Sequence, residues 1–426
     1  MSAASPGSGI PRLQELSFLS EAIHEVHDGG TFEDIRRRLI EHMTEKRQRE
    51  APTGNHAAFR LAVHNPTRYI DNATAALGEL MKLGFLERTA LPSTSAAAAA
   101  YQRRTFDPTA SGRAWAELMG GGPTTDRATG YDMLLRELWR IHPQFSGYLR
   151  LLATRPVVLP TARWSEANPS GASEVSPGAA RLRYVEFLAA RAAGAVTAGI
   201  TGWSGDQEEI AAAVRGYLED RFKAAERRKT GTPYARNRDF VGACEEALVS
   251  FAFRQAGLKL DYISLEILRR WTRVLGVANF SYYVPGPPAL RLWATAELDL
   301  DPDRQLHGVR RRSVAEHGDA VIDTLPDTIE QARRLDPDST WVPIYRVRAA
   351  IAMKLGLNDT TVDMALCQFI AGERRPDAPF GVNLESAEIG TTPPTETPLR
   401  VTDARTNRTL TYRVMAVVRR TERTPS

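Results

Sequence analysis

The most constraining feature of this sequence is a run of helix, strand, strand and helix between residues 69 and 119. Apolar residues at helical spacing end at Gly84, and glycine commonly follows the last turn of a helix because it tolerates a left-handed backbone. Residues 85–89 then predict one strand, and residues 102–106 predict a second strand that returns antiparallel to it. The segment 107–113 is typical of the cap of a closing helix.

Further helices precede this run. Residues 13–26 and 31–43 carry apolar side chains close to every third or fourth position, which predicts two helices with one buried face each. Asn65-Pro66-Thr67 supplies a cap for the helix that ends at Gly84. We therefore expect a domain over residues 12–122 in which three helices are followed by a hairpin and a fourth helix.

The motifs LGELMKLGFLERT and RRTFDPTASGRAWAEL, with a wing between them, resemble the winged helix-turn-helix superfamily over about residues 12–119. The resemblance implies that the third helix enters the major groove of duplex DNA, while the wing contacts the backbone or the minor groove. The residues implied to face DNA are Asn65, Thr67, Arg68 and Asn72 on the helix and Arg103 and Arg104 on the wing.

A second interpretation of these residues stays open. Asn65 and Thr67 can serve only as helix caps, and Arg68 can be an ordinary exposed residue. The chain up to residue 120 holds 14 basic and 14 acidic residues, and the wing segment 93–100 carries no positive charge. Many winged helices bind proteins, so this domain is compatible with either kind of partner.

The remainder of the chain predicts three more domains after a disordered tail at residues 1–11. Helical spacing dominates residues 123–235, which we expect to form a helical middle domain. Helices followed by a hairpin predict a second winged-helix-like domain at 236–300, and the same order predicts a third at 314–426, with a basic C-terminal strand. The expected fold class is mainly α with small β-hairpins, that is, α+β, with several winged-helix-like domains around a helical middle.

Arginine clusters mark further candidate DNA contacts in this half of the chain. One cluster lies on one side of the helix predicted at 262–275, and the other lies in the Pro-rich insertion and the strands at the C-terminal end. The net charge of the chain is only +4, but the segment 396–426 holds seven arginines against three acidic residues. The candidate residues are Arg269, Arg270, Arg273, Arg405, Arg408, Arg413, Arg419 and Arg420. The alternative is that these segments are unrelated α+β units with a solvated basic tail.

Motifs for catalysis and cofactor binding are missing from the sequence. It contains no GxxxxGK[ST] phosphate loop and no GxGxxG after a strand, so we expect no nucleotide-driven activity and no cofactor. Its two cysteines, Cys244 and Cys367, cannot form a four-ligand zinc site, and His24 with His27 lacks a third ligand. The alternating acids Asp299, Asp301 and Asp303 surround a proline in what reads as a loop, and we predict no metal site and no enzyme.

These patterns predict a non-enzymatic protein of a prokaryotic cytoplasm, with nucleoid association possible in principle, that binds double-stranded DNA as a subunit of a larger complex. The larger complex would act in replication, in chromosome handling or in defence against mobile elements. Protein partners are expected, and a membrane is not, because no apolar run is long enough to span a bilayer. The alternatives are a winged-helix scaffold that binds proteins, similar to the kleisin subunits of SMC complexes, and a ligand-responsive transcription regulator.

Overall fold

The computed structural model divides the chain into two compact units. The first comprises residues 1–146 and 300–308, and the second comprises residues 147–299 and 309–426. The structure describes residues 16–26, 30–31, 33–39, 41, 76–89, 105–119, 124–169, 176–199, 203, 205–231, 234–260, 262–337, 339–386, 398–403 and 408–419.

The first unit is built around a small antiparallel sheet flanked by helices. Its labelled elements are α1 (Leu16–Glu25), β1 (Gly30–Thr31), β2 (Leu86–Thr89), β3 (Thr105–Pro108), α6 (Ala110–Met119) and α7 (Thr124–Ile141), and residues 33–39 and 76–82 are also helical. Gly84 has a φ of +73°, which ends the helix 76–82 as predicted and lets the chain turn into β2. Phe85 then stacks on Trp115 of α6, with ring centroids 5.0 Å apart, so the hairpin and the closing helix share one core.

The loop at residues 300–308 belongs to the same unit. The Trp139 indole donates a hydrogen bond to the Arg304 carbonyl at 3.1 Å, and Arg136 donates to the His307 carbonyl at 3.2 Å. The strands on either side of this loop are β7 (Ala296–Leu300) and β8 (Leu306–Arg311), which pair as a two-stranded ribbon. The predicted break between residues 300 and 314 is therefore a hairpin rather than a linker.

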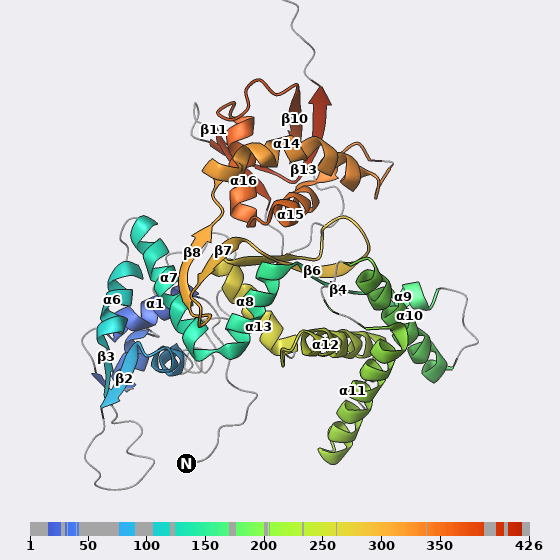
Figure 1. Cartoon of the computed structure of the whole chain (residues 1–426), viewed down its shortest axis with the longest axis horizontal. Helices are drawn as coiled ribbons and strands as arrows, with labels where there is room; N and C mark the ends of the chain where they lie inside the picture. Colours follow the sequence, from blue (N-terminus) through green and yellow to red (C-terminus); the bar gives the residue numbers. More distant parts are fainter. Residues whose placement is uncertain are drawn as a thin grey trace, which may run out of the picture. The chain divides into compact units, whose positions relative to one another are not determined.

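The second unit begins with a long helical region that closes on a three-stranded sheet (Figure 1). Its elements in chain order are α8 (Pro143–Thr154), whose first four residues belong to the first unit, β4 (Val157–Pro160), α9 (Trp164–Ala167), α10 (Pro177–Thr197), α11 (Gln207–Arg227), α12 (Asn237–Gln255), α13 (Tyr262–Val274), β5 (Ala278–Ser281) and β6 (Ala289–Ala294). Although the helices α9 to α13 separate β4 from the other strands in sequence, β4 pairs with β6 in register from Val157 opposite Leu292 to Pro160 opposite Ala289.

The rest of the second unit packs three helices against a second sheet, drawn in orange and red in Figure 1. The elements are α14 (Val314–Arg333), β9 (Val342–Pro343), α15 (Ile344–Leu355), α16 (Asp359–Ile370), β10 (Phe380–Glu385), β11 (Leu399–Asp403), β12 (Arg408–Tyr412) and β13 (Val414–Arg419). The apolar faces of the three helices meet in one buried cluster with Leu399 and Met415. This cluster also includes Trp293 of β6, so the two sheets of the unit share a continuous core.

The same strand order occurs three times along the chain. The three sheets have the orders β1-β3-β2, β4-β6-β5 and β9-β13-β10, and every pairing in them is antiparallel. In each sheet the last strand along the chain lies between the first and the second. A helix precedes the first strand and at least two helical segments precede the second strand in every case. We call these groups the first, second and third repeats.

The expected α+β composition is confirmed, because small antiparallel sheets accompany predominantly helical segments. The β2–β3 hairpin is confirmed as well, with Leu86 opposite Pro108 and Thr89 opposite Thr105. The predicted separation of 123–235 from 236–300 is corrected, because the β4–β6 pairing joins the two segments in one sheet. What we predicted as a separate helical domain supplies α8 and β4 to the second repeat and inserts α9, α10 and α11 into it.

The C-terminal strand also differs from its prediction. Instead of one strand over 409–420, the chain forms β12, which pairs with β11, and β13, which pairs with β10 and β9. Arg413 lies between β12 and β13, where its N–H donates to the Glu385 carbonyl at 3.0 Å and its carbonyl accepts from Ile344 N–H at 2.9 Å. Val414 and Met415 of β13 are both buried.

Candidate nucleic-acid interface

Helix α13 carries the predicted arginines whose side chains the structure describes in most detail. Its inner face buries Leu265, Leu268 and Trp271, whose spacing of three residues places them on one side of the helix. The opposite side exposes Arg270, and Val274 follows one turn later. The amphipathic pattern of the sequence therefore determines which arginines reach solvent.

Arg269 is held by the protein rather than presented to solvent. Its side chain is 11% exposed and forms an ion pair with Glu266. The guanidinium lies 4.6 Å from the centroid of the Phe280 ring, and it donates a hydrogen bond to the Tyr282 hydroxyl at 3.0 Å. These contacts fix α13 to the loop that leaves β5, so Arg269 has a structural role in addition to its charge.

Arg273 is also engaged, although its side chain is partly exposed. It donates to the Asp359 carboxylate at 2.5 Å, and the same carboxylate accepts from the side-chain amide of Asn279 at 2.8 Å. Asn279 is only 1% exposed, so its amide depends on protein partners for its hydrogen bonds. Asp359 is the first residue of α16, and the pair therefore links the second repeat to the third.

Arg270 is the predicted α13 arginine with the most accessible charge. Its side chain is 69% exposed, and its nearest carboxylate oxygen, on Glu266, lies 3.9 Å away. An exposed pair at that distance contributes little to stability, so the guanidinium is available to a ligand. Of the three arginines predicted on this helix, the structure leaves one free to make a new contact.

The corresponding helix of the third repeat has a different character. Helix α16 contains no basic residue, and its acids Asp359 and Asp363 lie one turn apart. Strand β11 packs along this helix, and the Cys367 thiol donates to the Arg400 carbonyl at 3.3 Å. The Pro-rich insertion lies between β10 and β13, and its described part includes the β11–β12 hairpin, which contacts α16.

Several predicted contact residues fall outside what the structure describes. The residues concerned are Asn65, Thr67, Arg68, Asn72, Arg103, Arg104, Arg405 and Arg420. The backbones of Arg408 and Arg419 belong to β12 and β13, but their side chains are not described. Their proposed role therefore rests on the sequence.

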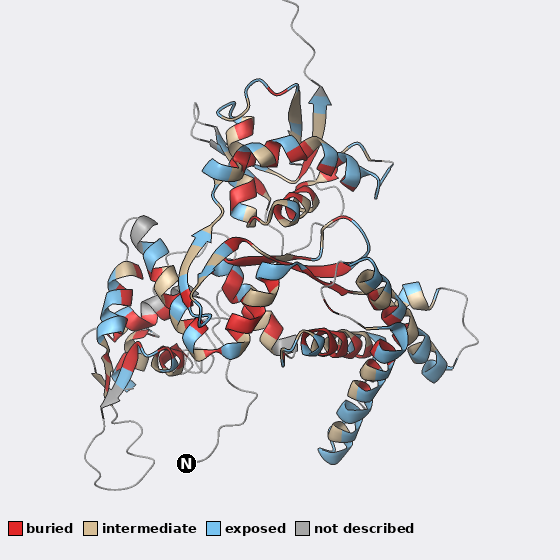
Figure 2. Cartoon of the chain, viewed as in Figure 1, coloured by how far each residue is buried: buried red, intermediate tan, exposed pale blue. Residues whose placement is uncertain are grey.

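A cluster of exposed cations lies at the end of α11, within the basic run 221–238 that the sequence predicts as a candidate phosphate-facing segment. Arg227, Arg228 and Lys229 are exposed, and among the described residues no carboxylate lies within ion-pair distance of them. Figure 2 shows exposed residues on all visible sides of the last turns of this helix. The signal in the sequence was the basic run 221–238, in which Arg221 pairs instead with Glu246.

The chain matches no family model, and neither a curated protein nor a solved structure is significantly similar to it. Within the described ranges, no helix is both long enough and apolar enough to span a bilayer. The same ranges contain no group of three histidine, cysteine or acidic side chains positioned to hold a metal ion.

Proposed function

We propose that the three repeats are winged helices and that this chain is a non-enzymatic protein that binds double-stranded DNA as a subunit of a larger complex. The observation that carries the proposal is the strand order shared by the three sheets. A winged helix has a helix pair followed by a two-stranded hairpin. A further strand, which comes earlier in the chain, pairs with the free edge of the hairpin's last strand. A repeated module of this kind suits an extended footprint on duplex DNA.

The second repeat supplies the best-defined DNA-contacting helix of this proposal. In a winged helix the second helix of the pair enters the major groove, and in this repeat that helix is α13. Arg270 is exposed on this helix. Arginine can donate two hydrogen bonds to the edge of a guanine base, or it can contact a phosphate. The free cations at the end of α11 would add phosphate contacts that do not depend on DNA sequence.

A second candidate function is supported by the third repeat. Helix α16 has no basic residue to offer a phosphate, and it packs against its own insertion, so it is a poor match for a phosphate backbone. Met364, which follows Asp363 on this helix, is 48% exposed. We propose that the third repeat contacts protein, as in a scaffold, while the second contacts DNA.

The proposal is tested by charge reversal at one exposed position. We expect R270E to weaken binding to a labelled duplex of about 40 base pairs by roughly tenfold, because it removes one contact and adds repulsion. R183E is the matched control, since Arg183 is an exposed arginine of α10 that makes no ion pair among the described residues. Equal affinity of the two variants in a fluorescence-anisotropy titration would exclude α13 from the interface.

A further inference from the structure

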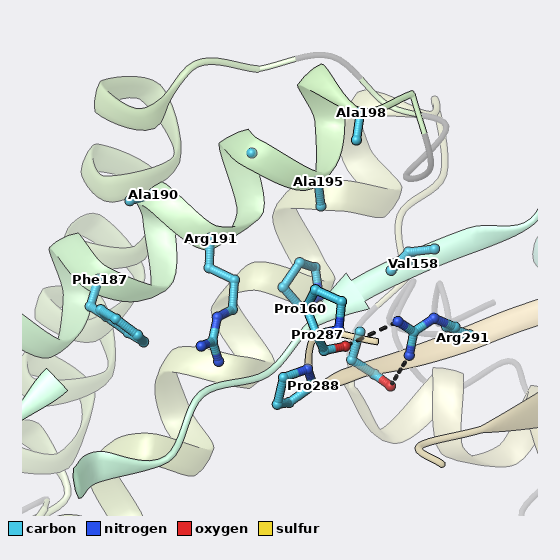
Figure 3. Close-up of a pocket in the computed structure, with 12 residues that line it drawn as sticks. Val158, Pro160, Phe187, Ala190, Arg191, Ala195, Ala198, Pro287, Pro288 and Arg291 are labelled. Carbon is cyan, nitrogen blue, oxygen red and sulfur yellow. Dashed lines mark hydrogen bonds between the residues drawn. The ribbon is translucent and has the colours of Figure 1, made fainter. Parts of the chain in front are cut away.

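A cavity of about 500 Å³ lies between α10 and the edge of the second repeat's sheet. Its apolar wall comes from Phe187, Ala190 and Ala195 of α10 and from Val158 of β4, and the prolines of the loop between β5 and β6 close another side (Figure 3). This volume is within the range of sites that hold small organic ligands. The insertion of α10 into the repeat therefore creates a space that the three strands alone would not enclose.

Two arginines line this cavity, and one of them is buried without a counter-ion. Arg291 of β6 is 5% exposed. It donates hydrogen bonds to the carbonyls of Val284 at 3.3 Å, Pro287 at 3.0 Å and Ala289 at 3.5 Å, but no carboxylate of the described chain lies within ion-pair distance. Burial lowers the pKa of Arg291, which reflects the cost of keeping this charge out of water.

The second arginine provides the contrast. Arg191 of α10 contacts the Glu166 carboxylate at 3.2 and 3.3 Å and the Thr161 carbonyl at 2.8 Å. Its positive charge is therefore matched by a negative one from α9. The cavity wall is left with one uncompensated positive charge, at Arg291, in surroundings that are otherwise apolar.

We propose that this cavity binds a small amphipathic carboxylate, with the carboxylate beside Arg291 and the apolar body against α10. Buried charges in proteins are usually paired, and an anionic ligand would supply the missing partner. Guanidinium groups bind carboxylates through strong charge-assisted hydrogen bonds. Because Pro287 and Pro288 also line the cavity, the bound molecule contacts the loop between β5 and β6.

Calorimetric titration of the full chain with octanoate and with 1-octanol tests this inference. The two probes have the same chain length and differ in charge. We expect saturable binding of octanoate, at least about tenfold tighter than that of octanol, because only octanoate forms charge-assisted hydrogen bonds with Arg291. R291M should remove this preference, and A195W should weaken both probes by filling the cavity. R183M replaces an exposed arginine of α10, the helix that carries Ala195. This variant should leave the affinities for octanoate and for octanol unchanged.

Three results would overturn the proposal. They are the absence of saturable octanoate binding, equal affinities for the two probes, and octanoate binding that A195W does not weaken. Two of these measurements do not require a folded R291M variant. They are the comparison of octanoate with octanol on the unmodified chain and the effect of A195W. If R291M does not fold, as judged by circular dichroism, these two measurements still decide the question.

Discussion

Arg269 and Arg270 are neighbours on α13, yet their side chains lie in different surroundings. Arg269 lies against Phe280 and Tyr282, whereas Arg270 extends into solvent. We expect R269A to lower the free energy of unfolding by about 1–3 kcal/mol, because it removes a ring contact and hydrogen bonds at a largely buried site. R270A should change it by less than about 0.5 kcal/mol. Urea denaturation of both variants measures the difference, and equal losses would contradict the assignment.

The sequence alone could place these arginines on one side of a helix but could not tell which were available. Helical spacing predicted α13 within a residue of its observed end. The partner of Arg273, however, is Asp359 on another repeat, and the rings beside Arg269 belong to the next strand and loop. Contacts over such separations depend on tertiary packing, which local patterns do not encode.

Glu245 of α12 provides a test of pH dependence. Burial raises its pKa from 4.5 to about 7. Below pH 4.5 the carboxyl is protonated in both the folded and the unfolded state. As the pH rises from 4.5 through 7 the unfolded state ionises first, so stability is lost across this window. We expect E245Q to be more stable than the parent by about 1–3 kcal/mol at pH 8 and equal to it near pH 4.

Thermal unfolding of E245Q and the parent at both pH values measures this effect. E245D, which keeps an ionisable group at the position, is the control. A stabilisation by glutamine of the same size at both pH values would mean that the pKa of Glu245 is the same in the folded and the unfolded state, and it would contradict the prediction.

At the scale of single elements, the β11–β12 hairpin turns an insertion into part of the third repeat's core. Leu399 of β11 is fully buried in the cluster, whereas Leu410 of β12 is 50% exposed. We expect L399A to cost about 2–5 kcal/mol, as for other buried leucines, and L410A to cost less than about 1 kcal/mol. The two variants remove the same atoms from one hairpin. Similar losses in a denaturation experiment would show that the hairpin does not pack on the repeat.

Elements were predictable where a local pattern defined both ends, and less so where strands were short. The turn at Gly84 and the helix α13 followed from the glycine position and from helical spacing. Strand β4 was visible as a short apolar run, but its partner β6 lies more than a hundred residues later, so the sequence did not reveal that it completes the second repeat. The hairpin went unpredicted although its strands alternate, with Leu399 and Val401 in one and Leu410 and Tyr412 in the other, because they are short and follow a Pro-rich segment.

On the scale of the whole molecule, the second and third repeats share side chains. The Trp293 indole of β6 donates to the Leu357 carbonyl at 2.9 Å, and Arg312 donates to the carbonyls of Leu355 and Gly356 at 3.1 Å. We expect W293A to cost about 3–5 kcal/mol and to speed amide hydrogen exchange in both repeats. W293F, which keeps an apolar ring, should have a smaller effect. Faster exchange confined to β5 and β6 would show that the repeats unfold independently.

The proposed function requires that this chain binds duplex DNA through exposed cations. Anisotropy titrations of the full chain with a duplex of about 40 base pairs, between about 50 and 200 mM salt, test it most directly. We predict measurable binding at the lowest salt and a slope of log affinity against log salt of about −4 or steeper, because each phosphate contact releases a counter-ion. No binding at the lowest salt, or an affinity that does not change with salt, would contradict the claim and favour a scaffold that binds only proteins.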